Sequence, residues 1–256
     1  MTGRATGGRY SERPARQTDG RAGTLQEVAE APGGQPVWSE VDRYIEDLLL
    51  GPDPALDSAT AASAAAGLPA IAVAPNQGKL LQLLVRASGA RSILEIGTLG
   101  GYSTIWMARA LPPAGRLVSL EMDPWHAEIA RRNVAVAGLS EVVEVRVGPA
   151  LAALEAMVAA GEGPFDLVFV DADKEHNADY LDWSLRLTAP GSLVVVDNVV
   201  RGGAVLQEAS TDSAVIGTRR LFERLSAEPH LSATAVQTVG SKGHDGFVIA
   251  VVGGPA

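Results

Sequence analysis

The spacing of apolar residues divides the chain into two differently patterned stretches. Before residue 90, apolar positions recur at 38, 41, 45 and 48, which predicts an amphipathic helix over 38–49 with Ser39 as its N-cap. Further helices are expected over 55–66 and around 80–85, the last one after the break at 75–78. After residue 90, short continuous runs of Val, Ile and Leu alternate with helical segments, a pattern typical of a parallel sheet covered on both faces.

This alternation predicts a doubly wound α/β fold with a mostly parallel, seven-stranded sheet. The parallel strands are expected near 92–96, 116–121, 142–147, 165–171 and 192–197. The helices between them are expected near 102–111, 124–137, 150–160 and 176–188. A polar loop over 201–213, a candidate lid, leads to a helix near 214–227. Two last strands, 231–239 and 246–252, are joined by a short loop and are therefore predicted to be antiparallel.

Composition limits the class of protein further. The 256 residues include no cysteine and carry a formal net charge of −9, which disfavours nucleic-acid binding because that needs clustered basic residues. Residues 1–36 have almost no periodic apolar positions and are predicted to be a disordered or loosely packed extension. The folded part is then expected over 37–256, with N-terminal helices over 37–89 and the α/β core over 90–256. Without a secretory signal or a bilayer-length apolar run, we expect a cytoplasmic protein that binds no membrane.

Four of the predicted strands end on or beside an acid: Glu95, Glu121, Asp171 and Asp197. The carboxyl ends of parallel strands border the ligand crevice, so we expect these carboxylates to face one pocket. Glu95 opens a glycine-rich turn that lacks the G-x-G-x-x-G spacing of dinucleotide-binding folds. A carboxylate there repels a pyrophosphate and attracts an ammonium group. S-adenosylmethionine, which carries an ammonium and a sulfonium and no phosphate, therefore fits this turn.

Glu121 lies one βα unit after Glu95, where an acid accepts hydrogen bonds from ribose hydroxyls. The alternatives are that Glu95 pairs with a helix N-terminus and that Glu121 is a solvated strand end. Farther along, Asp171, Asp197 and Asn198 offer three oxygens to a hard divalent cation.

Lys174 follows Asp171 closely and is one of three lysines among 21 basic residues. Lysine, unlike arginine, loses its proton when it is desolvated or placed near another cation. Lys174 is therefore either a proton-transfer group or an ordinary surface lysine.

These motifs, in this order, resemble the class I, S-adenosylmethionine-dependent and metal-dependent O-methyltransferases, a family that includes catechol and caffeoyl-CoA O-methyltransferases and bacterial small-molecule enzymes. The resemblance extends from about residue 75 to the C-terminus. It rests on residues 94–103, on Glu121, on 148–150, on 165–174 and on Asp197-Asn198. It implies a Rossmann-like methyltransferase fold, S-adenosylmethionine and a divalent cation, most simply Mg²⁺, as cofactors, and a homodimer.

The resemblance also implies roles for individual residues. Those expected to bind the cofactor are Glu95, Gly97, Thr98, Ser103, Glu121, Ala150 and Asp171. Met122 follows the ribose acid and either packs on the adenine face or fills a gap in the core. By resemblance the metal ligands are Asp171, Asp197 and Asn198, the catalytic base is Lys174, and Asp173 lies near the substrate.

The predicted activity is transfer of a methyl group from S-adenosylmethionine to a hydroxyl of a small, catechol-like or polyhydroxylated molecule, in natural product biosynthesis. The cation would orient and acidify the acceptor. One alternative is methylation of an acyl-CoA thioester such as caffeoyl-CoA, whose phosphates need basic groups, with Arg43, Arg201, Arg219 and Arg220 as candidates. The others are a nicotinamide-dependent dehydrogenase, a non-catalytic adenosylmethionine-binding protein and a nucleic-acid methyltransferase.

Overall fold

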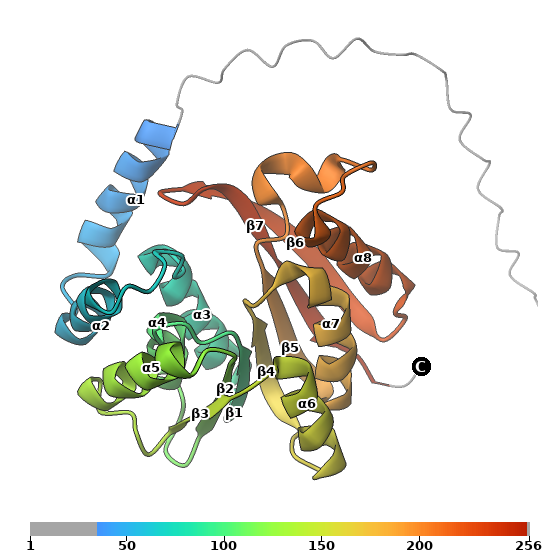
Figure 1. Cartoon of the computed structure of the whole chain (residues 1–256), viewed down its shortest axis with the longest axis horizontal. Coiled ribbons are helices and arrows are strands. Elements are labelled where there is room, and N and C mark those ends of the chain that lie inside the picture. Colours follow the sequence, from blue (N-terminus) through green and yellow to red (C-terminus); the bar gives the residue numbers. More distant parts are fainter. Residues whose placement is uncertain (1–34, 255–256) are drawn as a thin grey trace, which may run out of the picture. The chain divides into compact units, whose positions relative to one another are not determined.

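A seven-stranded mixed sheet forms the centre of the computed structural model, which describes residues 35–254 (Figure 1). The strand order is β3-β2-β1-β4-β5-β7-β6. The parallel strands are β1 (Ser92–Ile96), β2 (Arg116–Glu121), β3 (Val143–Val147), β4 (Phe165–Val170) and β5 (Thr188–Asp197). At the C-terminus, β7 (Gly243–Val252) is antiparallel to β5 and to β6 (Leu231–Gly240). The predicted fold class is confirmed, and the order reverses between β1 and β4, where ligands bind in doubly wound folds.

Helices cover both faces of this sheet (Figure 1). On one face lie α6 (Ala150–Ala159), α7 (Asn177–Arg186) and α8 (Ser213–Ala227). On the other lie α3 (Pro75–Ser88) and α4 (Tyr102–Ala108), and α4 packs in turn against α2 (Pro54–Ala65) and α5 (Pro124–Val136). Successive strand residues point to opposite faces, so Val194 and Val196 join the first core and Val195 joins the second. Burial on both faces explains the continuous apolar runs in the sequence.

The first helix, α1 (Gln35–Leu49), differs from its prediction. It begins three residues earlier than expected, and Ser39 lies inside it rather than at its N-cap. Of its predicted apolar face, Trp38 and Ile45 are half-buried, whereas Val41 and Leu48 are exposed. Apolar residues occur on two sides of this helix, so their spacing alone does not show which side packs inward.

Smaller differences concern the ends of elements and the predicted extension. β5 begins at Thr188 because this residue already pairs with Phe165 of β4. The predicted loop over 201–213 contains a short 3-10 helix, η2 (Arg201–Leu206). The predicted extension over 1–36 lies outside the described residues except for 35 and 36, which begin α1. Across residues 35–254, none of the helices has the length and apolar character needed to cross a bilayer.

Candidate active site

Gly97 brings the turn after β1 against the end of β4. Its φ is +101°, and a Cβ atom at this position would lie 2.2 Å from the carbonyl oxygen of Asp171. The Asp171 amide donates in turn to the carbonyl of Ile96, at 2.8 Å. Glycine alone combines this backbone conformation with so close an approach. The predicted cofactor turn and the predicted metal-binding strand end therefore meet at the point where the strand order reverses.

Glu95 is fully buried behind this turn. One carboxylate oxygen accepts a hydrogen bond from Ser103 at 2.6 Å, and the other accepts from Thr104 at 2.5 Å and Ser119 at 2.6 Å. Burial raises the pKa of Glu95 to about 7, although the three hydroxyls oppose this shift. Glu95 thus joins β1, β2 and α4, and its contact with a cofactor stays a prediction.

Glu121 ties the same turn to the end of β2. Its Oε2 accepts from the backbone amides of Thr98 and Leu99, at 3.2 and 2.7 Å, and its Oε1 accepts from the amide of Asp123 at 3.0 Å. The side chain is nearly buried, so the alternative of a solvated strand end is wrong. The Thr98 hydroxyl is likewise paired, 2.5 Å from the hydroxyl of Ser119.

Two predicted cofactor positions, Met122 and Ala150, lie just after strands β2 and β3. The Met122 side chain is 71% exposed, which contradicts the alternative of a core methionine. Ala150 is half-buried and is the first residue of α6. Both positions border the carboxyl end of the sheet, and their contact with an adenine ring stays a prediction.

The acids that follow β4 and β5 form the second half of the site. The Nζ atom of Lys174 donates to Oδ1 of Asp171 at 2.7 Å, and the lysine side chain is only 10% exposed. Lys174 is therefore not an ordinary surface lysine. Asp197 is buried, and its Oδ1 accepts from the backbone amide of Asn198 at 2.8 Å. Asn198 takes a left-handed conformation, with φ +58°, which asparagine adopts more readily than most residues.

The charges around Asp197 fit a cation. Burial, followed by the neighbouring Asp171, raises the pKa of the Asp197 carboxyl, and Lys174 and Gln77 only partly oppose this shift. Two carboxylates in a buried setting with one lysine leave excess negative charge when both are ionised. Together with the Asn198 carbonyl they are the oxygen donors that Mg²⁺ prefers. These residues therefore fit a divalent cation by their chemistry.

A cavity of about 430 Å³ adjoins Asp197 and Asn198. Of the four predicted acids, Asp197 is the one in its lining. Its walls come from the segment before α3, the start of α3 and the tip of the β6–β7 hairpin. The larger apolar side chains in the wall are Ile71, Val73, Leu80, Val239 and Phe247.

Several residues of this cavity are absent from the sequence-based predictions: Asp42, Gln77, Lys242 and Asp245. The motif at 75–78 was the available signal for Gln77, although it was interpreted as a helix break and as the start of the family resemblance, not as part of a site. A Cβ atom on Gly78 would lie 2.3 Å from the indole of Trp106, so the first turn of α3 packs tightly. This packing places Gln77 beside Asp197.

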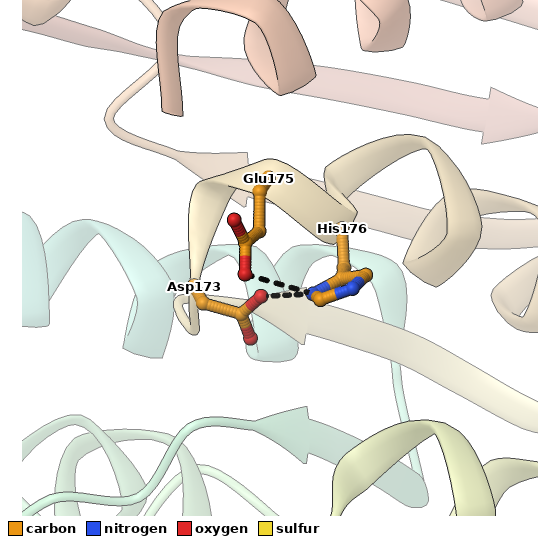
Figure 2. A group of neighbouring side chains, drawn as sticks. All are labelled: Asp173, Glu175 and His176. Carbon is orange, nitrogen blue, oxygen red and sulfur yellow. Dashed lines mark hydrogen bonds and ion pairs between the residues drawn. The ribbon is translucent and has the colours of Figure 1, made fainter. Parts of the chain in front are cut away.

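Figure 2 shows Asp173, Glu175 and His176 grouped around the short 3-10 helix η1 (Lys174–His176). Asp173 accepts from the hydroxyl of Tyr180 at 2.5 Å and also pairs with Nδ1 of His176. The hydrogen bond to Asp173 raises the pKa of His176. The side chains of Asp173 and Glu175 are exposed, and that of His176 is half-buried. Their mutual pairing braces the turn that carries Lys174.

Two solved structures resemble this one closely. An O-methyltransferase from Bacillus cereus, in complex with SAH, is 52% identical with a TM-score of 0.84, and the match covers 85% of this chain and 99% of that one. The O-methyltransferase TomG from Streptomyces achromogenes, involved in tomaymycin synthesis and solved in complex with SAM, is 50% identical with a TM-score of 0.83 over 86% and 99%. Fold and site together define this protein as a Rossmann-like methyltransferase.

Comparison of sequences narrows the class. A family model described as O-methyltransferase matches residues 53–249. A curated relative from Mycobacterium tuberculosis, named catechol O-methyltransferase, is 53% identical over 218 residues, which are 85% of this chain and 97% of the relative. The chain therefore belongs to the O-methyltransferase family and is an enzyme. The resemblance noted in the sequence is confirmed, and the dehydrogenase alternative is excluded.

Proposed function

We propose that this O-methyltransferase moves a methyl group from S-adenosylmethionine to a hydroxyl of a small catechol-like or polyhydroxylated molecule, with a divalent cation at Asp171, Asp197 and Asn198. The observation that carries the proposal is the pair of acids formed by the buried Asp197 and the half-buried Asp171, with Lys174 beside them, next to a cavity of about 430 Å³. The name of the M. tuberculosis relative supports a catechol, and the role of TomG supports a natural-product acceptor.

The residues of the chain divide the work between them. Lys174 would take the proton of the acceptor hydroxyl, and Asp171, at 2.7 Å, holds its amine in place. A cation held by the two aspartates and Asn198 would supply the positive charge that favours the deprotonated acceptor oxygen. Glu121 would accept hydrogen bonds from the ribose of the methyl donor, and Gly97 keeps the turn close enough to the acceptor side for direct transfer.

The size and charge of the cavity favour a small acceptor over an acyl-CoA thioester. Small-molecule sites commonly enclose roughly 300–1,000 Å³, and the cavity lies at the lower end of that range. Among the described residues that line it, Lys242 is the only basic one, against the three aspartates Asp42, Asp197 and Asp245. The arginines considered for the phosphates of coenzyme A, residues 43, 201, 219 and 220, are not in this lining. Even with the proposed divalent cation bound, the lining would carry no net positive charge to hold the phosphates of coenzyme A.

A methyl-transfer assay tests this function. Catechol, a phenol with a single hydroxyl and caffeoyl-CoA would each be offered with S-adenosylmethionine, with and without a chelator. We expect turnover of the catechol, lost with chelator and restored by Mg²⁺, and little turnover of the other two. Preference for the thioester would contradict the proposed acceptor class. Turnover that a chelator does not reduce would contradict the proposed role of a divalent cation.

A further inference from the structure

A single carboxylate, that of Asp42 in α1, joins three elements at the mouth of the cavity. Its Oδ2 accepts a hydrogen bond from the backbone amide of Ser241, at 2.7 Å, in the turn between β6 and β7. Its Oδ1 accepts from the side-chain amide of Asn76, at 3.3 Å, in the first turn of α3. Asp42 also belongs to the lining of the cavity that contains Asp197. The helix, the hairpin tip and the start of α3 are thus held together beside the proposed acceptor site.

A second link crosses the same cavity. Nζ of Lys242, also at the hairpin tip, donates to the carbonyl of Ala70 at 3.1 Å, and both residues line the cavity. The hairpin tip is therefore bonded to α1 through Ser241 and to the segment before α3 through Lys242. Between these two contacts, the hairpin tip forms part of the cavity wall.

Gly240 shows how closely the tip fits against α1. A Cβ atom on Gly240 would lie 2.4 Å from Oδ2 of Asp42, and contacts this short require one partner to move. On the other side of α1, Val41, Tyr44 and Leu48 are exposed. The helix is thus held mainly by the face that carries Asp42, so the link to Ser241 has a large share in keeping the wall in place.

We infer that Asp42 is a positioning residue that latches the β6–β7 tip over the acceptor cavity and thereby sets the size of acceptor that the enzyme accepts. The inference rests on the proposed function, because it takes this cavity as the acceptor site. With the latch intact the wall encloses a small molecule. With the latch broken, the wall recedes, so small acceptors are held more loosely and bulkier ones gain room.

Steady-state kinetics of the Mg²⁺-loaded full-length enzyme tests the latch. Asp42→Ala, Asp42→Asn and Gly240→Ala would be compared with Asp47→Ala, which removes an exposed carboxylate from the same helix. Removing a hydrogen bond to a charged group predicts a roughly tenfold rise in KM for catechol in Asp42→Ala. In the same variant, the ratio of kcat/KM for a polyhydroxylated flavonoid to kcat/KM for catechol should rise above that of wild type. The affinity for SAH, measured by calorimetry, should be unchanged, and Asp47→Ala should behave as wild type.

Backbone hydrogen exchange over residues 238–243 separates failure of the latch from failure of the proposed function. Exchange should be faster in Asp42→Ala and Gly240→Ala than in wild type and Asp47→Ala, whatever the acceptor proves to be. Unchanged exchange would overturn the latch. Faster exchange with an unchanged ratio of flavonoid to catechol turnover would overturn its role in acceptor size. Binding of SAH without methylation of any hydroxylated compound would count against the proposed acceptor instead.

Discussion

The Nζ atom of Lys174 and the Oδ1 atom of Asp171 lie 2.7 Å apart in the segment that follows β4. The two residues have different proposed tasks, since the lysine takes a proton and the aspartate holds a cation. An incoming divalent cation competes with the ammonium group for the same carboxylate. Both proposed tasks therefore depend on the carboxylate of Asp171.

Lys174→Ala is expected to lower kcat by roughly 100-fold or more, because general-base catalysis commonly contributes 10²–10⁴-fold. The affinity for SAH should change little, since no predicted cofactor contact involves the amine. Lys79→Ala is a suitable control, because that lysine bonds to Gln82 within α3. Turnover of Lys174→Ala close to that of wild type would remove the lysine from the mechanism.

Asp197→Asn should abolish most activity and weaken Mg²⁺ binding, which isothermal titration calorimetry in the presence of SAH would measure. The substitution removes one of the two carboxylate charges proposed to hold the cation. Asp182→Asn, which alters an acid paired with Arg224 at 2.6 Å, is the matched control. Equal Mg²⁺ affinity in the two variants would show that the cation does not bind at Asp197.

The stability of the protein should depend on pH through Glu95. Burial raises the pKa of this carboxyl from 4.5 to about 7, so the folded state binds more protons between these two values. The free energy of unfolding should therefore fall as the pH rises from about 4.5 to about 7, by on the order of 3 kcal/mol from this group. Denaturant titrations at pH 5 and pH 8 should show that the free energy of unfolding falls more between these pH values in wild type than in Glu95→Gln. An equal fall in the free energy of unfolding in the two proteins would contradict the raised pKa of Glu95.

Gly97→Ala should impair both folding stability and SAH binding. The new methyl group would be strained at φ +101° and would meet the carbonyl of Asp171. Gly138→Ala separates the two effects, because Gly138 also has a positive φ, +72°, but a Cβ atom there would have no neighbour within 4 Å. Gly138→Ala should destabilise the protein by about 1–2 kcal/mol, the cost of a left-handed conformation for a residue with a Cβ atom. Gly97→Ala should destabilise it more and should also lower the affinity for SAH. Similar effects of the two substitutions would show that the contact between Gly97 and the carbonyl of Asp171 has no special importance.

The predicted homodimer has a suitable surface in β6. This strand forms the edge of the sheet, contains no charged residue and has eight exposed positions in its ten residues. Edge strands without charges readily pair with another strand, and antiparallel pairing of two copies satisfies a two-fold axis. Val236→Lys should shift the protein toward the monomer in light scattering, whereas Val136→Lys, at an exposed position of α5, should not. A monomeric wild type, or a dimer that tolerates Val236→Lys, would contradict this surface.

The sequence predicted the order of elements and the position of the four acids at the carboxyl edge of the sheet, because both follow from local patterns. Continuous apolar runs mark the buried strands, and acids at their ends fall together at the carboxyl edge of a parallel sheet. The surroundings of Glu95 were beyond this reasoning, since its hydroxyl partners come from α4 and β2. The contact of Asp42 with Ser241 was equally inaccessible, because the two residues lie 199 positions apart. Such contacts depend on tertiary packing, which the spacing of apolar residues along the chain does not predict.

The meeting of Gly97 with Asp171 at the centre of the sheet has a consequence for how this enzyme can evolve. Gly97, proposed to hold the methyl donor, lies in a turn where an added Cβ atom would meet the backbone of Asp171. The proposed acceptor cavity is lined instead by a peripheral helix, a connecting segment and a hairpin tip. We therefore expect substitutions in these segments to change the acceptor that the enzyme takes, while the residues proposed for the methyl donor are preserved.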